Sequence, residues 1–289
     1  MSDISCMSFN ILDWDTHYDG YEPAEKRFDY VLKIIEKYDP DLLGVQEAAE
    51  LGSSPNSVFD WCGRLTAALD ERGFAASHLR DGKDFKLGKM NIGCGLIIFY
   101  KKNRFTLTDS GCHEYEHDPD RYYQWVKLTD EKYKKPILFT NTHFSIDPYI
   151  IDGWNPAAGN AYRTVEAVKL LKFWQKNCPP DTALFATGDY NSTPYTTPQT
   201  LLSGKRFKPS NLVALAWDDC GSMHTSRQFY TLDYCYVNPS AQQIDGYRVI
   251  KDTFPSDNKE YAMAGYPSDH RPVLTRATYK TVPEEGVKP

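Results

Sequence analysis

Short apolar segments alternate with amphipathic segments along almost the whole chain, and this alternation limits the fold more than any other feature. Residues 5–12 and 41–46 are apolar on both faces, which predicts two buried central strands. Between them, apolar side chains at helical spacing over residues 28–35 predict a helix that Pro23 opens and Pro40 ends. A strand, a helix and a strand in succession favour a layered α/β domain.

The rest of the chain continues this pattern without an internal repeat or a linker. We expect further helices over residues 57–72, 162–176 and 198–202, and strands over residues 94–100, 122–128, 136–144, 182–187, 232–237, 247–250 and 272–279. Residues 145–160 are expected to form a loop long enough to shape access to a site. These elements predict one domain over residues 1–280, followed by a tail over residues 281–289.

The charge balance argues against some partners. A dedicated binder of long nucleic acid carries a basic face, whereas this chain has 33 Lys and Arg against 39 Asp and Glu, a net charge of −6. Its apolar runs, such as residues 96–100, are far shorter than the roughly 20 residues that a membrane-spanning helix needs. Seven cysteines without a C-x-x-C pair favour reduced thiols, and no signal peptide is visible. We expect a cytoplasmic monomer that does not enter a membrane, and nucleic acid is not its favoured partner.

Polar side chains gather where the predicted strands end. Asn10, Glu47, His143 and Asp189 follow apolar runs, while Asp233 begins one run and residues 269–270 precede another. Each has an ordinary alternative, since asparagine and aspartate form turns and a lone histidine is commonly a buried core residue. Sites in open α/β sheets form at the ends of strands, however. One shared site therefore explains these positions better than separate turns.

The acids and amides among these residues match the ligands of a hard metal ion. Glu47 and Asp269, with Asn10 nearby in the fold, would offer the oxygen ligands that Mg²⁺ prefers. Mg²⁺ keeps open positions for substrate phosphate. The sequence thus predicts hydrolysis assisted by a divalent metal.

Other residues of the set suit proton transfer. His270 follows an acid and has an ordinary pKa near working pH, and Asp233 would fix its tautomer if the fold brings the two together. Asp189 and Asn191 are two apart on a segment expected to be extended, so they should point to the same side. One would orient a water molecule and the other the transferring group.

Six short segments, in order, resemble the endonuclease/exonuclease/phosphatase superfamily of DNase I-like, metal-dependent phosphohydrolases. They are SFNIL (8–12), PDLLGVQE (40–47), FTNTHF (139–144), TGDYNSTP (187–194), LDY (232–234) and SDHRPV (268–273). The resemblance covers residues 6–278. It implies a four-layered α/β/β/α sandwich of two packed, mainly antiparallel sheets, with the site at one edge.

The resemblance also implies which residues bind the metal and move protons. Glu47 is similar to the principal ligand of Mg²⁺ or Mn²⁺, helped by Asn10 and Asp269. His270 is similar to the family's general base and would be paired with Asp233.

Four further residues would act on the water and the phosphate. Asp189 would activate or orient the nucleophilic water, and Asn191 would hold a phosphate oxygen. His143 would stabilise charge that builds on the phosphorus centre. Arg121 resembles the family's strand arginine near the phosphate, although a surface arginine is an equal alternative at this position.

Three alternatives stay open. The segment HEYEH (113–117) matches the H-E-x-x-H pattern of zinc peptidases, but Gly111 and Pro119 flank it, so we expect a polar loop between strands. A catalytically silent binding scaffold on the same fold is disfavoured because all the core positions are filled. A nuclease acting on DNA or RNA is the main alternative within the enzymes, and the acidic charge favours a small soluble phosphomonoester or phosphodiester over it.

Overall fold

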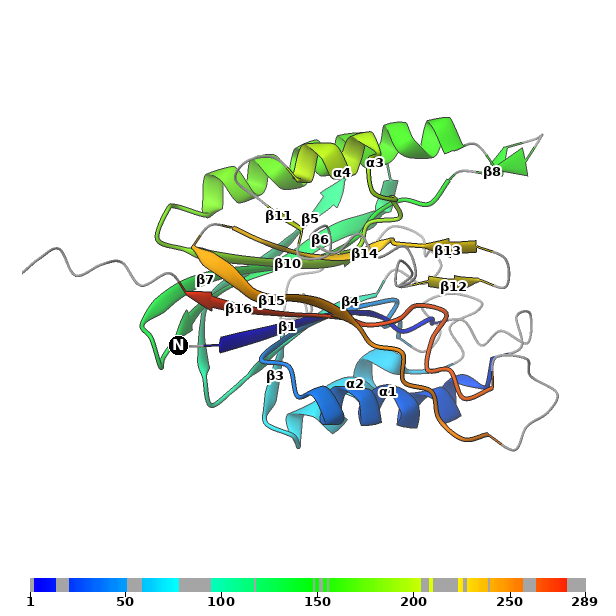
Figure 1. The fold of residues 1–289 in the computed structure, drawn as a ribbon, viewed down its shortest axis with the longest axis horizontal. Coiled ribbons are helices and arrows are strands. Elements are labelled where there is room, and N and C mark those ends of the chain that lie inside the picture. Colours follow the sequence, from blue (N-terminus) through cyan, green and yellow to red (C-terminus); the bar gives the residue numbers. More distant parts are fainter. Residues whose placement is uncertain are drawn as a thin grey trace, which may run out of the picture.

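The chain folds into two packed sheets with helices on both outer faces. The computed structural model describes residues 3–13, 21–50, 59–77, 95–116, 118–147, 149–150, 153–154, 156–203, 208–209, 223–225, 228–238, 240–256 and 264–279. Figure 1 shows helices α1 (Ala24–Tyr38) and α2 (Trp61–Asp70) below the sheets, and α3 (Pro156–Asn177) and α4 (Thr197–Leu202) above them. The expected α/β/β/α sandwich is confirmed. Residues 281–289, the predicted tail, lie outside the described residues.

The first sheet has six strands and one parallel pair. Its order is β15 (Ala241–Val249), β16 (Val273–Tyr279), β1 (Asp3–Asn10), β2 (Leu42–Gln46), β4 (Leu96–Lys101) and β3 (Phe74–Ser77). Strands β1 and β2 are parallel and α1 connects them, whereas every other neighbouring pair is antiparallel.

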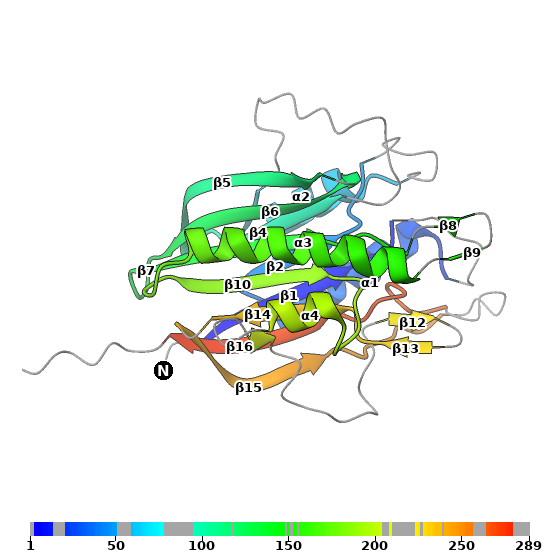
Figure 2. The ribbon, with the colours of Figure 1, turned by 90° about the horizontal axis from the view of Figure 1, so that it is seen from above.

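The second sheet repeats this plan. Its order is β11 (Lys208–Pro209), β14 (Asp233–Val237), β10 (Ala183–Asp189), β7 (Lys135–His143), β6 (Asp118–Asp130) and β5 (Phe105–Tyr115). Strands β7 and β10 are its parallel pair, and α3, which lies in the connection between them, runs along β10 in Figure 2. Two short hairpins lie apart from both sheets, β8 (Tyr149–Ile150) with β9 (Gly153–Trp154) and β12 (Met223–Thr225) with β13 (Gln228–Tyr230).

This topology collects strand ends at one edge of the sandwich. The carboxyl ends of two parallel strands meet at the same edge, and an antiparallel neighbour begins where they end. In the second sheet Asp189 is therefore paired with His143 on one side and with Asp233 on the other. In the first sheet Asn10 ends β1 beside Gln46 at the end of β2.

Three apolar layers hold the sandwich together. One lies between α1, α2 and the first sheet and includes Phe28, Val31 and Trp61. A second lies between the sheets, and a third, which includes Trp174, packs α3 against the second sheet. The buried stripe of α1 is the one that the sequence predicts. Among the described residues, no helix is long and apolar enough to cross a membrane.

Some element boundaries differ from the sequence-based expectation. Helix α2 begins at Trp61 instead of residue 57, because the side chain of Asp60 caps it by accepting a hydrogen bond from the Gly63 N–H at 3.0 Å. Helix α3 begins at Pro156 instead of residue 162, so the expected loop of residues 145–160 is partly helix and partly the β8–β9 hairpin. Strand β3 has no counterpart in the sequence-based expectation.

The expected polar loop around His113 is wrong. His113 lies in β5, a strand whose side chains are largely exposed, and its ring packs against Tyr123 and Phe173 at centroid distances of 5.3 and 5.6 Å. A zinc peptidase needs its H-E-x-x-H segment on a helix, which turns both imidazoles to one side. His117 lies outside the described residues.

A charged cluster joins the two sheets at the opposite edge. The guanidinium of Arg104 contacts Asp41, which precedes β2, at 2.8 Å and Asp130, which ends β6, at 2.9 Å. The Tyr279 hydroxyl at the end of β16 also donates to Asp130, at 2.8 Å. Every charge of this cluster has an opposite charge beside it, so its contribution is to join strands.

At Gly44 in β2 the two sheets approach so closely that a side chain would not fit. A Cβ added there would lie 1.9 Å from the Thr187 Oγ1 and 2.8 Å from the Asn141 Oδ1. We expect Gly44→Ala to lower the free energy of unfolding by about 1–3 kcal/mol, the usual cost of overpacking, measured by urea denaturation. Adding Thr187→Ala to this variant should recover part of the loss. Strictly additive effects of the two substitutions would contradict the steric explanation.

Candidate active site

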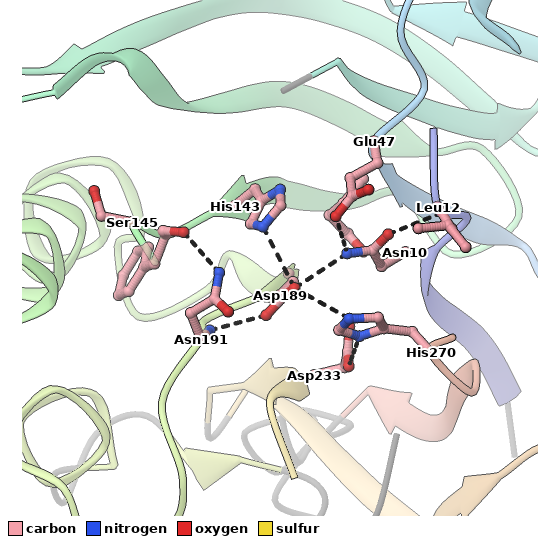
Figure 3. Close-up of polar contacts among 12 residues, drawn as sticks. Asn10, Leu12, Glu47, His143, Ser145, Asp189, Asn191, Asp233 and His270 are labelled. Carbon is pink, nitrogen blue, oxygen red and sulfur yellow. Dashed lines mark hydrogen bonds and ion pairs between the residues drawn. The ribbon is translucent and has the colours of Figure 1, made fainter. Parts of the chain in front are cut away.

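The polar residues predicted from the sequence converge where the strands of both sheets end. Figure 3 shows their side chains pointing toward one another: Asn10 from β1, Glu47 after β2, His143 from β7, Asp189 from β10, Asp233 from β14 and His270 before β16. Except for the half-buried Glu47, all of these residues are buried. The two sheets thus contribute to a single site.

The amide of Asn10 connects carboxylates of the two sheets. Its Nδ2 donates to Glu47 Oε1 at 2.8 Å and to Asp189 Oδ2 at 3.1 Å (Figure 3). Its Oδ1 accepts a hydrogen bond from the Leu12 N–H at 3.1 Å, which fixes the orientation of the amide. Asn10 would therefore have to turn its amide to offer an oxygen to a metal.

One oxygen of Asp189 faces three nitrogen atoms. Besides Asn10 Nδ2, the Nε2 of His143 lies 3.4 Å and the Nε2 of His270 lies 3.7 Å from Asp189 Oδ2. The other oxygen, Oδ1, accepts a hydrogen bond from the Asn191 N–H at 2.9 Å. Asp189 is thus the centre of the site.

His270 is oriented by a second carboxylate and by a serine. Its Nδ1 lies 2.8 Å from Asp233 Oδ2, which turns Nε2 toward Asp189. The Ser268 hydroxyl accepts from the His270 N–H at 3.1 Å and donates to the Asn10 carbonyl at 2.7 Å. Sequence analysis did not assign a role to Ser268, although it stands directly before Asp269 and His270.

The charges of His270 and Asp189 reinforce each other. Burial lowers the pKa of His270, but the charges of Asp233, Asp269 and Asp189 outweigh it and raise that pKa well above its ordinary value. Burial raises the pKa of Asp189, but the charge of His270, above all, and hydrogen bonds from Asn191 and Asn10 outweigh it and lower that pKa. The two groups therefore favour an imidazolium beside a carboxylate.

The pKa of His143 shifts in the opposite direction to that of His270. Burial, followed by the charge of Arg121, lowers the pKa of His143 to about 3, so the ring is neutral at working pH. A neutral imidazole stabilises charge by donating a hydrogen bond. Arg121 lies on β6, is buried and acts electrostatically on His143, so the structure places it beside the other predicted residues.

The donor set fits a divalent cation. Burial and the negative charge of Asp269 raise the pKa of Glu47 to about 7, which reports carboxylates crowded together. Ligand atoms of Glu47, His143 and Asp189 lie within 4.8 Å of one another, as do those of Asp189, Asp233 and His270. Because a cation would relieve this repulsion, and oxygen ligands suit Mg²⁺ and Mn²⁺, the residues present fit such an ion.

Strained backbone accompanies the site. Three non-glycine residues in it have left-handed backbone angles: Leu12 with φ 57°, Glu47 with φ 60° and Asn191 with φ 45°. Such residues cost free energy and collect at functional sites. At Asn191 the chain turns, and its Nδ2 donates to the Phe144 carbonyl at 2.9 Å. The expectation that Asp189 and Asn191 lie on one extended segment is therefore wrong.

A comparison with models of known protein families shows which family the chain belongs to. The sequence model of the Endonuclease/Exonuclease/phosphatase family matches residues 18–270. The chain belongs to this family. Family members hydrolyse phosphoester bonds and typically depend on a divalent metal. Among curated protein sequences, none matches the chain.

Solved structures share the fold of this family member. The human Nocturnin catalytic domain with bound sulfate is 18% identical, with 96% of this chain and 94% of that chain covered and a TM-score of 0.68. A mannosyl-6-phosphatase from Bacteroides thetaiotaomicron is 18% identical, with 96% and 100% covered and a TM-score of 0.66. TDP2 from D. rerio, complexed with a single-strand DNA product, is 14% identical, with 96% and 100% covered and a TM-score of 0.69. At these identities the likeness shows the fold.

The contact of His270 with Asp233 makes a testable prediction. Replacing Asp233 with Asn removes the negative charge that contributes most to raising the pKa of His270. We expect Asp233→Asn to move the NMR titration of the His270 ring protons to lower pH in the metal-free protein. Asp109→Asn, an exposed acid on β5, is the matched control and should leave the titration unchanged. An unchanged midpoint in Asp233→Asn would show that Asp233 does not hold the proton on His270.

Proposed function

We propose that the protein is a Mg²⁺- or Mn²⁺-dependent hydrolase of a small soluble phosphoester, in which an activated water attacks phosphorus in line with the leaving group. The observation that carries the proposal is the convergence on Asp189 Oδ2 of Asn10 Nδ2, His143 Nε2 and His270 Nε2 at 3.1–3.7 Å. Glu47 stands directly beside these atoms, because its Oε1 accepts a hydrogen bond from the same Asn10 amide. Proton-transfer groups and metal ligands thus occupy one site, as metal-assisted hydrolysis requires.

Glu47 is the principal ligand in this proposal, with Asp269 and Asn10 as the further ligands. The ion, when bound, would supply Lewis-acid stabilisation of a phosphate oxygen. The Asn10 amide would have to turn, since its nitrogen faces the carboxylates and an amide binds a metal through oxygen. The charge of Asp269 on Glu47 supports a shared ion between them.

Asp189 and His270 would act together on the attacking water. Asp189, whose lowered pKa keeps it ionised, orients the water and accepts its proton as the water oxygen bonds to phosphorus. His270 was expected from the sequence to be the general base, but the carboxylates around it favour its protonated form. We therefore assign the base to Asp189. His270, oriented by Asp233, lies 3.7 Å from Asp189 Oδ2 and so faces the same water, where its positive charge would keep that carboxylate ionised. The leaving oxygen, on the opposite side of phosphorus, would take its proton from solvent as its bond to phosphorus breaks.

Three further residues would bind the phosphate. Arg121 supplies a buried positive charge, and the neutral ring of His143 supplies an N–H donor. Asn191 has one amide hydrogen on the Phe144 carbonyl, and the second is left to bind a phosphate oxygen. Together they would stabilise the charge that develops on the transferring group.

The charge of the chain supports a small substrate. Its net charge of −6 opposes non-specific attraction to long polyphosphate chains. The likeness to a mannosyl-6-phosphatase is consistent with a small phosphoester. A nuclease is the alternative, supported by the likeness to TDP2 complexed with a single-strand DNA product. A silent binding scaffold is the second alternative, and the first experiment below separates it from both.

Metal removal is the first test of the proposal. We expect a phosphodiester or a phosphomonoester reporter to be hydrolysed with Mg²⁺ or Mn²⁺, and hydrolysis to stop with EDTA and return when metal is added back. Glu47→Ala should require a higher metal concentration for half-maximal rate. The ratio of the two reporter rates indicates whether small phosphates or nucleic acids are assayed next. A protein that cleaves neither reporter with either metal would favour the scaffold.

The proton-transfer residues make the second test. We expect His270→Ala and Asp189→Ala each to lower kcat by about 10²-fold or more, as acid–base groups do. His113→Ala is the matched control, because His113 lies on β5 among aromatic rings, and its rate should stay within about twofold of the wild type, as for a residue outside the site. Near-normal kcat in folded Asp189→Ala would refute its role. A large loss in His113→Ala, with zinc in the protein, would instead favour the zinc alternative.

A further inference from the structure

Arg27 is a fully buried arginine on α1 that binds backbone carbonyls. Its Nε donates to the Glu22 carbonyl at 3.0 Å, and Nη1 donates to the Ile11 and Pro267 carbonyls at 2.9 and 3.2 Å. Its Nη2 donates to the Leu12 carbonyl at 2.9 Å. The rigid fork of a guanidinium can satisfy several carbonyls at once, which the single ammonium of lysine cannot do in the same geometry.

These carbonyls belong to the two segments that carry one half of the site. Ile11 and Leu12 directly follow Asn10, and Leu12, with its left-handed backbone, also donates its N–H to the Asn10 side chain at 3.1 Å. Pro267 directly precedes Ser268, whose hydroxyl donates to the Asn10 carbonyl at 2.7 Å. One guanidinium therefore joins the end of β1 to the segment that leads into β16.

A buried glutamate on α3 has the corresponding place in the second sheet. Both carboxylate oxygens of Glu166 accept from the Ser145 N–H, at 3.2 and 3.1 Å, and the Ser145 hydroxyl donates to Glu166 as well. Ser145 lies two residues after His143. Arg163, one turn earlier on α3, donates to the Ser145 carbonyl at 3.1 Å and pairs with Asp147 at 2.8 Å. The loop after β7 is thus held by α3.

We propose that Arg27 and Glu166 are positioning residues, each held on the crossover helix of one sheet and each fixing one half of the active site. Arg27 holds the backbone that follows Asn10, and so keeps Asn10 beside Glu47, the principal metal ligand of the proposed function. Glu166 holds the loop that follows His143, and so sets the imidazole against Asp189. The proposal rests on the proposed function, because it divides the site of that function into a metal half and an imidazole half.

The division predicts that substitutions at Arg27 and at Glu166 change different quantities, the affinity for Mn²⁺ and kcat respectively. Replacing a residue that orients a metal ligand typically lowers metal affinity or activity about 10- to 100-fold. Arg27→Lys and Arg27→Met should therefore raise the dissociation constant for Mn²⁺ about tenfold, measured by EPR of free Mn²⁺ without substrate. Glu166→Gln should leave the Mn²⁺ dissociation constant within about twofold of the wild type and lower kcat on the phosphodiester reporter about tenfold.

Arg104→Met is the matched control for a general loss of stability. Arg104 is also a largely buried arginine that joins strands of the sandwich, but it does so at the edge opposite the site. This variant should lower the melting temperature and leave both the Mn²⁺ dissociation constant and kcat near their wild-type values. Arg27→Lys keeps the positive charge, so it provides a folded variant if Arg27→Met does not fold.

The outcomes separate this proposal from the proposed function. Unchanged Mn²⁺ affinity in the Arg27 variants, or an equal loss of affinity in Arg104→Met, overturns the role of Arg27. Weakened Mn²⁺ binding in Glu166→Gln, or an unchanged kcat, overturns the role of Glu166. A wild-type protein that binds Mn²⁺ but hydrolyses no phosphoester refutes the proposed function, while the Mn²⁺ measurements still decide the role of Arg27. A wild-type protein that does not bind Mn²⁺ overturns both.

Discussion

The amide nitrogen of Asn10 donates to a carboxylate on its own sheet and to a carboxylate on the opposite sheet, at 2.8 and 3.1 Å. This contact exists only while the two sheets keep their separation and register. Two further hydrogen bonds join the two sheets. Gln46 Nε2 donates to Asn141 Oδ1 at 2.6 Å, and the Gly188 N–H donates to the Ser8 hydroxyl at 3.1 Å. A polar network in the core costs desolvation but specifies one register, since a shifted sheet would leave these groups without partners.

The two edges of the sandwich use charge in different ways. At the edge opposite the site, Arg104 lies between Asp41 and Asp130, so each carboxylate has a cation beside it. At the site, the carboxylates of Glu47 and Asp269 act on each other by repulsion. The pKa of Glu47 rises to about 7 because burial and Asp269 disfavour its charge, while the charge of His270 lowers the pKa of Asp189. Two carboxylates joined by one amide thus differ in their readiness to hold a proton, and a bound cation would favour the ionised form of Glu47.

Sequence patterns predicted the elements that are buried and periodic. Strands such as β2 and β10 are apolar on both faces, so the sequence shows where each of them ends. The polar residues at these ends are the ones that converge in the structure. Strand β5 was missed because its side chains are largely exposed and alternate weakly, so that pairing with β6 decides its conformation. The turn at Asn191 has a local hydrogen bond to Asp189, two residues earlier, and a second one to the Phe144 carbonyl. The second partner is distant in the sequence, so no local pattern encodes it. Arg27 was missed for a related reason, since a single arginine in an amphipathic helix gives no sign that it is buried.

The repeated β–α–β unit explains why helices remote from the chemistry influence it. In each sheet a parallel pair needs a helix to return the chain to the same edge, so α1 and α3 both lie against the strands whose ends form the site. A helix in that position can send a long or charged side chain to the loops that leave those strands. The loops carry strained residues, such as Leu12 with φ 57°, which persist only where surrounding contacts fix them. Arg27 supplies such a contact at the Leu12 carbonyl, and Glu166 binds the loop after His143, so the fold that creates the site also provides the means to hold it rigid.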